Sequence, residues 1–509
     1  MGRPPRILLV NPWVHDFAAY DLWARPLGLL YVGAVLRAAG CQVHLIDCLD
    51  RLHPDVVAKV GLLGAREDGT GKFFRQAIPK PSALRHVPRR FSRYGMPVEV
   101  FDRLLRACAR PDAILVTTGM TYWYTGAMET VGRLREAFPG VPVVVGGIYA
   151  TLCPDHARQT LAPDALVEGP AENQVVRVVN RVCGWSLPEP RYETLDEIPF
   201  PAYELYPRLE AVALLTSRGC PYRCTFCASS LLTGGPAQRA PGAVVEEIAY
   251  WIKRGVRHVA FYDDALLFRA DEHIKPILEL IVCRGLKVQF HTPNGVPPRA
   301  IDADLAVLLH RAGFSTLRLS FETISRERQH DMGSKVTAED LARALHYLEH
   351  AGFQRQRVGV YLLMGLPGQD VREVVESILF VAGLGASVHL ACFSPIAGTR
   401  EYQRAVEWGL LPPEVDPLLC NESVYPLSDS RIGFWHYVRL RNFATSLNRR
   451  IRAGHRLAPL LHAGEVVDEI VHPRFSSVEE FLRRFERVRA KTRTEASAPR
   501  TAHLNSEEE

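Results

Sequence analysis

Three cysteines crowd into one short stretch of the chain, Thr216-Ser-Arg-Gly-Cys220-Pro-Tyr-Arg-Cys224-Thr-Phe-Cys227, and the other cysteines are scattered singly. This spacing does not indicate a disulfide framework; it indicates a reduced compartment and an inorganic centre. Three thiolates on one Gly/Pro-containing loop can converge on an iron–sulfur cluster, and a [4Fe–4S] cluster with three protein ligands keeps one iron free. A closed structural zinc site needs four protein ligands, and no further cysteine or histidine pair lies nearby. Zinc, or three incidental buried cysteines, is therefore the weaker alternative.

The cysteine loop follows the first of six expected strands. These strands lie near residues 212–216, 258–262, 288–292, 316–321, 357–364 and 388–394, with helices between them, for example at 243–253, 302–312 and 338–351. Strand–helix units at a spacing of roughly 30 residues predict a partial, TIM-like (β/α)6 barrel over residues 212–400, open or closed. Barrel enzymes keep their sites at the carboxyl ends of the strands, where this loop is expected.

The cysteine spacing, with the aromatic Phe226 before the last cysteine and a six-unit barrel after it, resembles the radical S-adenosylmethionine (SAM) superfamily. The resemblance implies that Cys220, Cys224 and Cys227 hold a [4Fe–4S] cluster whose free iron chelates the amino and carboxylate groups of SAM. Reduction then cleaves SAM to methionine and a 5′-deoxyadenosyl radical, so the cofactors supply the difficult chemistry. It also implies an electron donor such as flavodoxin or ferredoxin.

Polar residues and glycines at the ends of the later strands fit the same resemblance. Asp263 and Asp264 stand where the family often has Gly-Gly-Glu, and a carboxylate there can still pair with the SAM ammonium. The SAM-binding candidates are Phe226, Asp263, Asp264, Asn294, Ser320, Glu322 and Gly365. Simpler interpretations stay open, because the aspartates can cap the next helix, Glu322 can be a surface charge and residues 365–368 can form only a turn. No residue is assigned to catalysis.

The first 183 residues alternate strands with helices. Strands are expected at 6–11, 42–47, 113–118, 141–147 and 165–169, and helices at 27–39, 125–138 and 172–182. This alternation predicts a doubly wound, Rossmann-like α/β domain over residues 1–183, with ligands at the carboxyl ends of its strands. A long connection at 50–110 interrupts it, and residues 66–110 carry eleven Lys or Arg against four Asp or Glu. Such a connection is often functional, and a solvated surface insertion is the simpler alternative.

This first domain resembles the cobalamin-binding domains attached to many radical SAM enzymes. The resemblance rests on Arg25-Pro-Leu-Gly, on the strand that ends at Asp47, and on the segments 117–124 and 146–151. It implies that the tail of cobalamin lies beside the sheet, where glycines permit close approach of the backbone. The implied contacts are Thr117, Thr118, Gly146, Gly147 and Tyr149.

One motif of cobalamin domains is missing. The sequence Asp-x-His-x-x-Gly, which provides a histidine to cobalt, is replaced by Asn11-Pro-Trp-Val-His15-Asp16. We therefore expect cobalamin, if bound, to have no histidine on the metal. His15 remains an alternative axial ligand because imidazole binds metals readily, and a polar surface histidine is the simpler interpretation.

The remaining segments carry less information. Residues 184–211 are predicted to be a linker, 401–487 a helical region with seven arginines and no acid between 431 and 456, and 488–509 a disordered tail. The cysteines outside the triplet, such as Cys283, Cys392 and Cys420, are interpreted as small core residues, so no auxiliary cluster is expected.

Composition excludes several classes of protein. The 509 residues are 47% hydrophobic and 23% charged, which is typical of a packed globular protein and excludes disorder, collagen and coiled coil. A net charge of +5 is too small to indicate nucleic-acid binding, and no helix-turn-helix is evident, so DNA is not expected. No signal-peptide layout and no apolar window of about 20 residues is present, so we expect a cytoplasmic protein without a membrane span.

The leading hypothesis is a cobalamin-dependent radical SAM enzyme that transfers a methyl group to an unactivated carbon or phosphorus of an unknown substrate. The two resemblances cover roughly residues 5–400. The alternatives are a radical SAM enzyme with a vestigial first domain, and a non-catalytic cobalamin or Fe–S sensor. The two basic segments can engage an anionic substrate, RNA or membrane headgroups, or they can face solvent or neutralise a cofactor phosphate.

Overall fold

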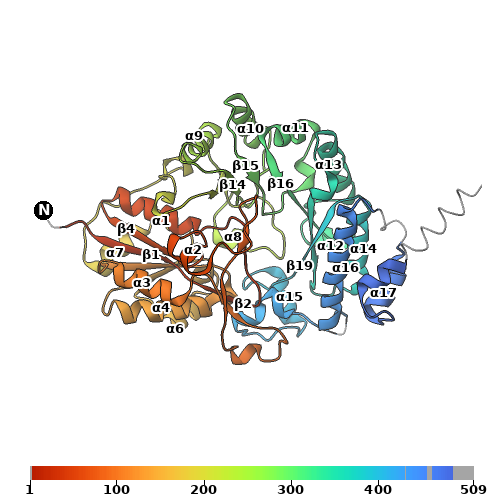
Figure 1. Ribbon diagram of the computed structural model, residues 1–509, viewed down its shortest axis with the longest axis horizontal. Coiled ribbons are helices and arrows are strands. Elements are labelled where there is room, and N and C mark those ends of the chain that lie inside the picture. The colour runs from red at the N-terminus through yellow and green to blue at the C-terminus, as the bar shows by residue number, and fades with distance from the viewer. Residues whose placement is uncertain (1–2, 430, 456–460, 485–509) are drawn as a thin grey trace, which may run out of the picture.

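The computed structural model of the chain describes residues 3–429, 431–455 and 461–484. Figure 1 shows two α/β units, with the N-terminal sheet at the left and the later strands and helices arching over the centre and right. The expected tail, residues 488–509, lies outside the described residues. Among the described residues, no helix is both long and apolar enough to cross a lipid bilayer.

The first unit is built on a parallel five-stranded sheet. Its order is β10-β9-β8-β1-β4. The strands are β1 (Arg6–Asn11), β4 (Gln42–Asp47), β8 (Ala113–Thr118), β9 (Val143–Gly147) and β10 (Ala165–Val167). If the five strands are numbered along the chain, their order in the sheet is 2-1-3-4-5, which is that of a doubly wound fold. All strands are parallel, and the order in which successive strands are added to the sheet reverses between β1 and β8. The predicted fold class is confirmed, and three of the five strands have the predicted bounds.

Both faces of this sheet are covered, so its strands are apolar throughout. Ile7 and Leu9 pack with α1 (Leu27–Ala38) and α7 (Val175–Cys183) on one face. Leu8 and Val10 point the opposite way, as the two-residue period of a strand requires. That second face is covered by α3 (Val98–Ala107), α4 (Tyr124–Ala137) and α6 (Pro154–Leu161).

The connection at residues 50–110 folds back over the loop that follows β1. Its strand β7 (Ser92–Tyr94) pairs with β2 (Val14–Asp16) and with β6 (Arg75–Ala77), and β5 (Gly71–Lys72) pairs with β3 (Tyr20–Asp21). The segment also contains the helix α2 (Pro54–Val60). The insertion is therefore packed against the domain rather than simply solvated.

The second unit has six parallel β/α positions. One ladder joins β11 (Ala211–Leu214), β14 (His258–Phe261), β15 (Gln289–His291) and β16 (Phe314–Thr316). A second ladder joins β17 (Arg318–Glu322), β18 (Gly359–Met364) and β19 (Ser387–Cys392). The fourth predicted strand is thus divided at Leu317, and the predicted barrel of six strands is present. The outer layer is formed by α9 (Pro241–Ile252), α10 (Ile274–Cys283), α11 (Ala303–Ala312), α13 (Ala338–His350) and α14 (Val371–Gly383) (Figure 1).

The barrel is open, because no ladder among the described strands joins β19 to β11. The free edge of β19 lies beside α16 (Phe434–Arg452), as Figure 1 shows. The Asn448 side chain accepts a hydrogen bond from the Val388 N–H at 2.7 Å and donates one to the Val388 carbonyl at 2.6 Å. An amide side chain thereby takes the place of a neighbouring strand. The described C-terminal region also contains the helices α15 (Arg400–Glu407) and α17 (Ala463–Val471), the short 3-10 helices η7 (Pro417–Cys420) and η8 (Glu422–Val424), and a helical segment at 478–484.

Candidate functional site

The cysteine loop leaves the barrel directly after β11. A short antiparallel pair, β12 (Ser217–Arg218) with β13 (Ala237–Gln238), holds its two ends together. Gly219 has φ 75, and an added Cβ would lie 2.9 Å from the Gly234 carbonyl oxygen, so only glycine fits there. The loop then presents Cys220 and Cys224 half-buried and Cys227 exposed.

Burial and nearby negative charges raise the pKa of the three thiols. Burial is the largest cause for each, and the pKa of Cys224 is raised to about 11 in all. The Cys227 thiolate also raises the pKa of Cys220 and Cys224, whereas the carboxylates of Asp264 and Glu322 raise that of Cys227. In the described residues, no three His, Cys, Asp or Glu side chains are gathered tightly enough for a single metal ion. Each thiolate of a [4Fe–4S] cluster binds a different iron, so the sulfurs need not meet at one point. A thiol triplet with an open side fits a cluster better than it fits a single ion.

Lys335 faces this triplet, and sequence reasoning missed it. Its ammonium favours the thiolate form of all three cysteines and lowers their pKa values. The Lys335 Nζ lies 3.9 Å from Glu322 Oε1, and its position between α12 (Arg326–Asp331) and α13 carries no motif. Only the tertiary fold brings it to the cysteines.

The two aspartates after β14 have different roles. Asp263 is 3% exposed, and its carboxylate accepts hydrogen bonds from the Thr216 hydroxyl at 2.6 Å and the Ser217 hydroxyl at 2.6 Å. This carboxylate fixes the base of the cysteine loop, and these contacts give it a structural role; its predicted contact with SAM stays a prediction. Asp264 is exposed and accepts a hydrogen bond from the Gly219 N–H at 3.2 Å. Neither aspartate begins a described helix, so the helix-cap alternative is wrong.

The next three candidates lie at the ends of β15 and β17. Asn294 is exposed and donates a hydrogen bond to the Tyr262 carbonyl at 3.1 Å. Ser320 is 4% exposed, and its buried hydroxyl has no hydrogen-bond partner among the described residues. Glu322 has φ 69, and burial raises the pKa of its carboxyl group. A buried hydroxyl without a partner and a strained carboxylate are features of ligand-binding sites.

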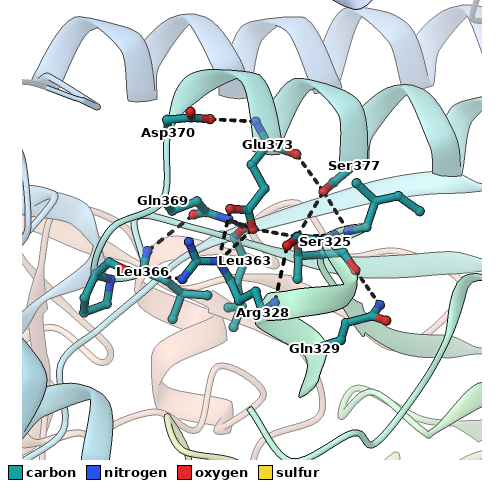
Figure 2. Close-up of polar contacts among 12 residues, drawn as sticks. Ser325, Arg328, Gln329, Leu363, Leu366, Gln369, Asp370, Glu373 and Ser377 are labelled. Atoms are coloured by element: carbon teal, nitrogen blue, oxygen red, sulfur yellow. Dashed lines mark hydrogen bonds and ion pairs between the residues drawn. The ribbon is translucent and has the colours of Figure 1, made fainter. Parts of the chain in front are cut away.

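A polar network around Glu373 fixes the loops after β17 and β18 (Figure 2). The Glu373 carboxylate accepts hydrogen bonds from Arg328 Nε at 2.8 Å and from Gln369 Nε2 at 3.2 Å. The Gln369 side-chain oxygen accepts one from the Gly365 N–H at 2.7 Å. Because Arg328 belongs to α12, which follows β17, and Gln369 belongs to the loop after β18, the network links the segments that follow Glu322 and Gly365.

Two further SAM candidates have structural explanations. Gly365 has φ 87, and an added Cβ would lie 2.9 Å from Cε1 of Tyr437 and collide with its hydroxyl. The packing of α16 against this position is by itself a sufficient reason for glycine, and the predicted approach of the adenosyl group stays a prediction. Phe226 packs partly buried against a small apolar cluster that includes Met332, Leu366 and Phe393.

A cavity of about 330 Å³ opens between the two units. On the N-terminal side it lies over the sheet face that α1 and α7 cover, and its walls are mostly aliphatic, including Leu29, Val32 and Val144. On the barrel side it is bounded by Arg218, Tyr262 and Asp264. An apolar slot with a polar mouth suits an elongated ligand whose tail is buried.

Three of the five cobalamin candidates line this cavity and two do not. Thr117, Gly146 and Gly147 line it. Thr118 instead donates its hydroxyl to the Gly146 carbonyl at 2.8 Å. Tyr149, in α5 (Ile148–Leu152), is fully buried on the opposite sheet face, where its hydroxyl contacts His156. The contacts of these two residues are structural, and their predicted contact with cobalamin stays a prediction.

The glycine that ends β9 is required by the backbone. Gly147 has φ 101, and an added Cβ would lie 2.7 Å from the Thr118 N atom. A side chain at that position would separate β8 from β9 at the end of the sheet that faces the cavity.

His15 does not line the cavity. It is 5% exposed in β2, and its Nε2 lies 3.1 Å from Glu129 Oε2 on α4. Arg93 of β7 also pairs with Glu129 at 2.6 Å, and the two partners lower the pKa of this carboxyl group to about 2 against the effect of burial. The His15 imidazole is thus buried beside Glu129 and away from the cavity that Gly146 and Gly147 line.

Comparisons with known proteins bear on both units. A family model described as the radical SAM superfamily matches residues 214–381, and one described as the B12 binding domain matches residues 91–179. An uncharacterized methyltransferase of Pyrococcus horikoshii is 25% identical over 59% of this chain and 71% of its own. The cytidylyl-2-hydroxyethylphosphonate methyltransferase of Streptomyces wedmorensis is 24% identical over 89% of this chain and 90% of its own.

The solved structures agree with these matches. The structure of the radical SAM methyltransferase TsrM from Kitasatospora setae, with cobalamin and a [4Fe–4S] cluster bound, has a TM-score of 0.61. It covers 97% of this chain and 100% of that chain at 17% identity, so this likeness establishes the fold. The two family matches confirm the resemblance drawn from the sequence.

Proposed function

We propose that the chain transfers a methyl group, with cobalamin, to an unactivated centre of its substrate, because family models of the radical SAM superfamily and of the B12 binding domain match its two units. One observation carries this proposal: the two candidate cofactor sites share a wall. The cavity that Gly146 and Gly147 line also contains Asp264, which binds the N–H of Gly219, the residue before Cys220. A cobalamin in that cavity would border the cysteine loop directly.

Separate groups of residues would bind the cluster and SAM. Cys220, Cys224 and Cys227 hold the cluster, and Lys335 offsets part of their negative charge. Asp264 and the buried Ser320 hydroxyl bind SAM from the strand ends. When bound, the cluster and SAM supply the 5′-deoxyadenosyl radical, and cobalamin supplies the methyl group.

Further residues hold the loops of the site in position and shield the cobalamin tail from water. Asp263 holds the base of the cysteine loop, and Glu373 holds the loops after β17 and β18. The aliphatic walls around Val32 and Val144 exclude water from the cobalamin tail. A low-potential donor such as flavodoxin or ferredoxin reduces the cluster.

The proposal is tested by a substitution that fills the 330 Å³ cavity with a bulky side chain. Gly28 lines it, and an added Cβ there meets no atom within 4 Å, so Gly28→Trp inserts an indole without a backbone clash. The matched control is Gly132→Trp on α4, where the space is also open. We expect anaerobically reconstituted wild-type protein and Gly132→Trp to bind cobalamin, and Gly28→Trp to lose it while keeping its iron. Wild-type protein that binds no cobalamin would support the vestigial-domain alternative.

Product analysis completes the test. With SAM, a reductant and a substrate, methyl transfer predicts both S-adenosylhomocysteine and 5′-deoxyadenosine, because one SAM donates the methyl group and a second forms the radical. 5′-Deoxyadenosine alone would support the enzyme with a vestigial first domain. If neither product is formed, the alternative of a non-catalytic sensor is supported.

A further inference from the structure

A second cavity, of about 410 Å³, lies where α16 covers the open edge of the barrel. Tyr361 and His389 form its barrel wall, and Arg441, Asn448 and Arg452 form its α16 wall. The bonds from Asn448 to Val388 hold the helix against β19 beside this cavity. The open edge is therefore covered by a helix that also presents arginines to the barrel.

These arginines form no ion pair among the described residues, although Glu422 is near enough to Arg441 to interact with it electrostatically. Within the part of the chain that the structure describes, no ion pair involves Arg441, Arg452 or Arg318, and the buried Nε of Arg441 makes no hydrogen bond. By contrast, Arg449 and Arg450 of the same helix both pair with Glu479. The basic run in the sequence thus separates into paired arginines and arginines that face a cavity.

The inner end of the cavity is also positively charged. Gly359 lets Arg318 and His389 come together, since an added Cβ would lie 2.7 Å from a carbon of each. Burial, together with the guanidinium groups of Arg318 and Arg452, lowers the pKa of His389 to about 4. Among the described residues, Glu422 is the one acidic side chain that lines the cavity. Two guanidinium groups line it as well, those of the half-buried Arg441 and the exposed Arg452, and the half-buried Arg318 lies next to His389. The cavity therefore carries an excess of positive charge that an anion would complement.

We infer that this cavity binds the substrate through an oxyanion group, a carboxylate or a phosphoryl group, held by Arg441 and Arg452 with Arg318 behind them. The guanidinium fork matches both groups by paired N–H···O bonds. The inference rests on the proposed function, because it describes the substrate of that reaction.

Tyr361 connects the cavity with the SAM side of the barrel. Its hydroxyl donates a hydrogen bond to the Pro293 carbonyl at 2.8 Å. An added Cβ on Gly295 would lie 3.1 Å from both the Tyr361 ring and Ser320 Cβ. A substrate anchored on the arginines would therefore extend past this ring toward Ser320.

The test measures anion binding, which does not require turnover. Pyrophosphate and succinate are titrated by calorimetry into the anaerobic holoprotein at constant ionic strength. Losing a charge-assisted hydrogen bond costs about 1.5–3 kcal/mol, so Arg441→Gln and Arg452→Gln should weaken binding roughly tenfold or more. Arg449→Gln, on the same helix but paired with Glu479, is the matched control and should bind as wild type does. If pyrophosphate binds more tightly the substrate group is a phosphoryl group, and if succinate binds more tightly it is a carboxylate.

Arg441→Lys tests whether the weaker binding of Arg441→Gln comes from misfolding. Lysine keeps the positive charge, so this variant should retain part of the affinity for the probe that Arg441→Gln loses. The inference is overturned if neither probe binds, or if Arg449→Gln weakens binding as much as the two cavity variants do. Cobalamin content is measured on the same samples. Protein without cobalamin that still binds a probe through Arg441 would contradict the proposed function and leave the anion site standing.

Discussion

The Thr216 hydroxyl donates a hydrogen bond of 2.6 Å to the carboxylate of Asp263, so the end of β14 holds the start of the cysteine loop. The Thr216 N–H binds the same carboxylate at 3.0 Å, and His273 Nε2 lies 2.9 Å from the Thr216 hydroxyl. A buried carboxylate with several donors is a fixed support rather than a ligand group. The adjacent Asp264 is exposed and accepts only the Gly219 N–H, so we propose that it, and not Asp263, contacts SAM.

Replacing each aspartate by alanine should separate support of the cysteine loop from binding of SAM. Asp263→Ala should reduce the iron content after reconstitution, because the loop loses its support. Asp264→Ala should keep the iron and weaken SAM binding by about 2 kcal/mol, close to 30-fold, because a charge-assisted partner of the ammonium is lost. Iron analysis and SAM binding by equilibrium dialysis measure the two effects. Unchanged SAM affinity in Asp264→Ala would contradict its assignment.

The cluster prediction concerns the thiols themselves. Anaerobically reconstituted protein should hold about four iron and four sulfide per chain. Replacing Cys220, Cys224 or Cys227 by Ala should abolish the cluster and leave the N-terminal domain folded. Cys283→Ala is the control, since that exposed cysteine lies outside the loop. Full iron content in the triple variant would show that the cluster is elsewhere.

Gly365 and Tyr437 should be energetically coupled. Gly365→Ala forces a β-carbon into the ring of Tyr437 at φ 87, which should destabilise the barrel by about 1–3 kcal/mol. Tyr437→Phe removes the nearest atom, so the double variant should recover part of that loss. Chemical denaturation of the four proteins gives the coupling energy. Strictly additive effects would mean that this contact does not explain the glycine.

Cobalamin should bind with its own base detached and with no histidine nitrogen on cobalt. His15 Nε2 already lies 3.1 Å from Glu129, and the axial ligand is one means by which a protein tunes its metal. Electron paramagnetic resonance of the Co(II) state should show no nitrogen splitting from the protein. A splitting that is present in the wild type and disappears in His15→Ala would refute this prediction.

Acid should destabilise the chain through His291. Burial lowers the pKa of this histidine to about 3, whereas the unfolded chain titrates near 6.5. Between these values the unfolded state binds a proton that the folded state does not, so stability falls as pH falls from about 6.5 toward 3, by at most about 1.4 kcal/mol per pH unit. Melting temperatures at pH 7 and pH 5 should differ less in His291→Gln than in wild type. Equal differences would contradict the role of His291.

Much of the fold was predictable because it depends on local patterns. Buried parallel strands are continuous apolar runs, and for this reason β1, β4 and β8 have the predicted bounds. The division of the fourth barrel strand at Leu317 has no signal in the sequence.

The site was predictable only in part, because the direction of a side chain depends on packing. Asp263 and Asp264 are adjacent, yet one is buried and one is exposed. The direction of Tyr149 was not predictable because it lies in a helical turn after β9, where the phase of the helix decides which sheet face it contacts. Lys335 and Tyr437 reach the site from distant segments, and no motif marks them.

The shared wall between the two candidate cofactor sites has a kinetic consequence. Arg218, which precedes the cysteine loop, donates a hydrogen bond to Glu172 of the N-terminal unit, and both residues line the 330 Å³ cavity. A buried tail in that cavity would have to pass this contact in order to leave. Exchange of bound cobalamin would then be limited by separation of the two units, so its residence time would report on their docking rather than on affinity alone.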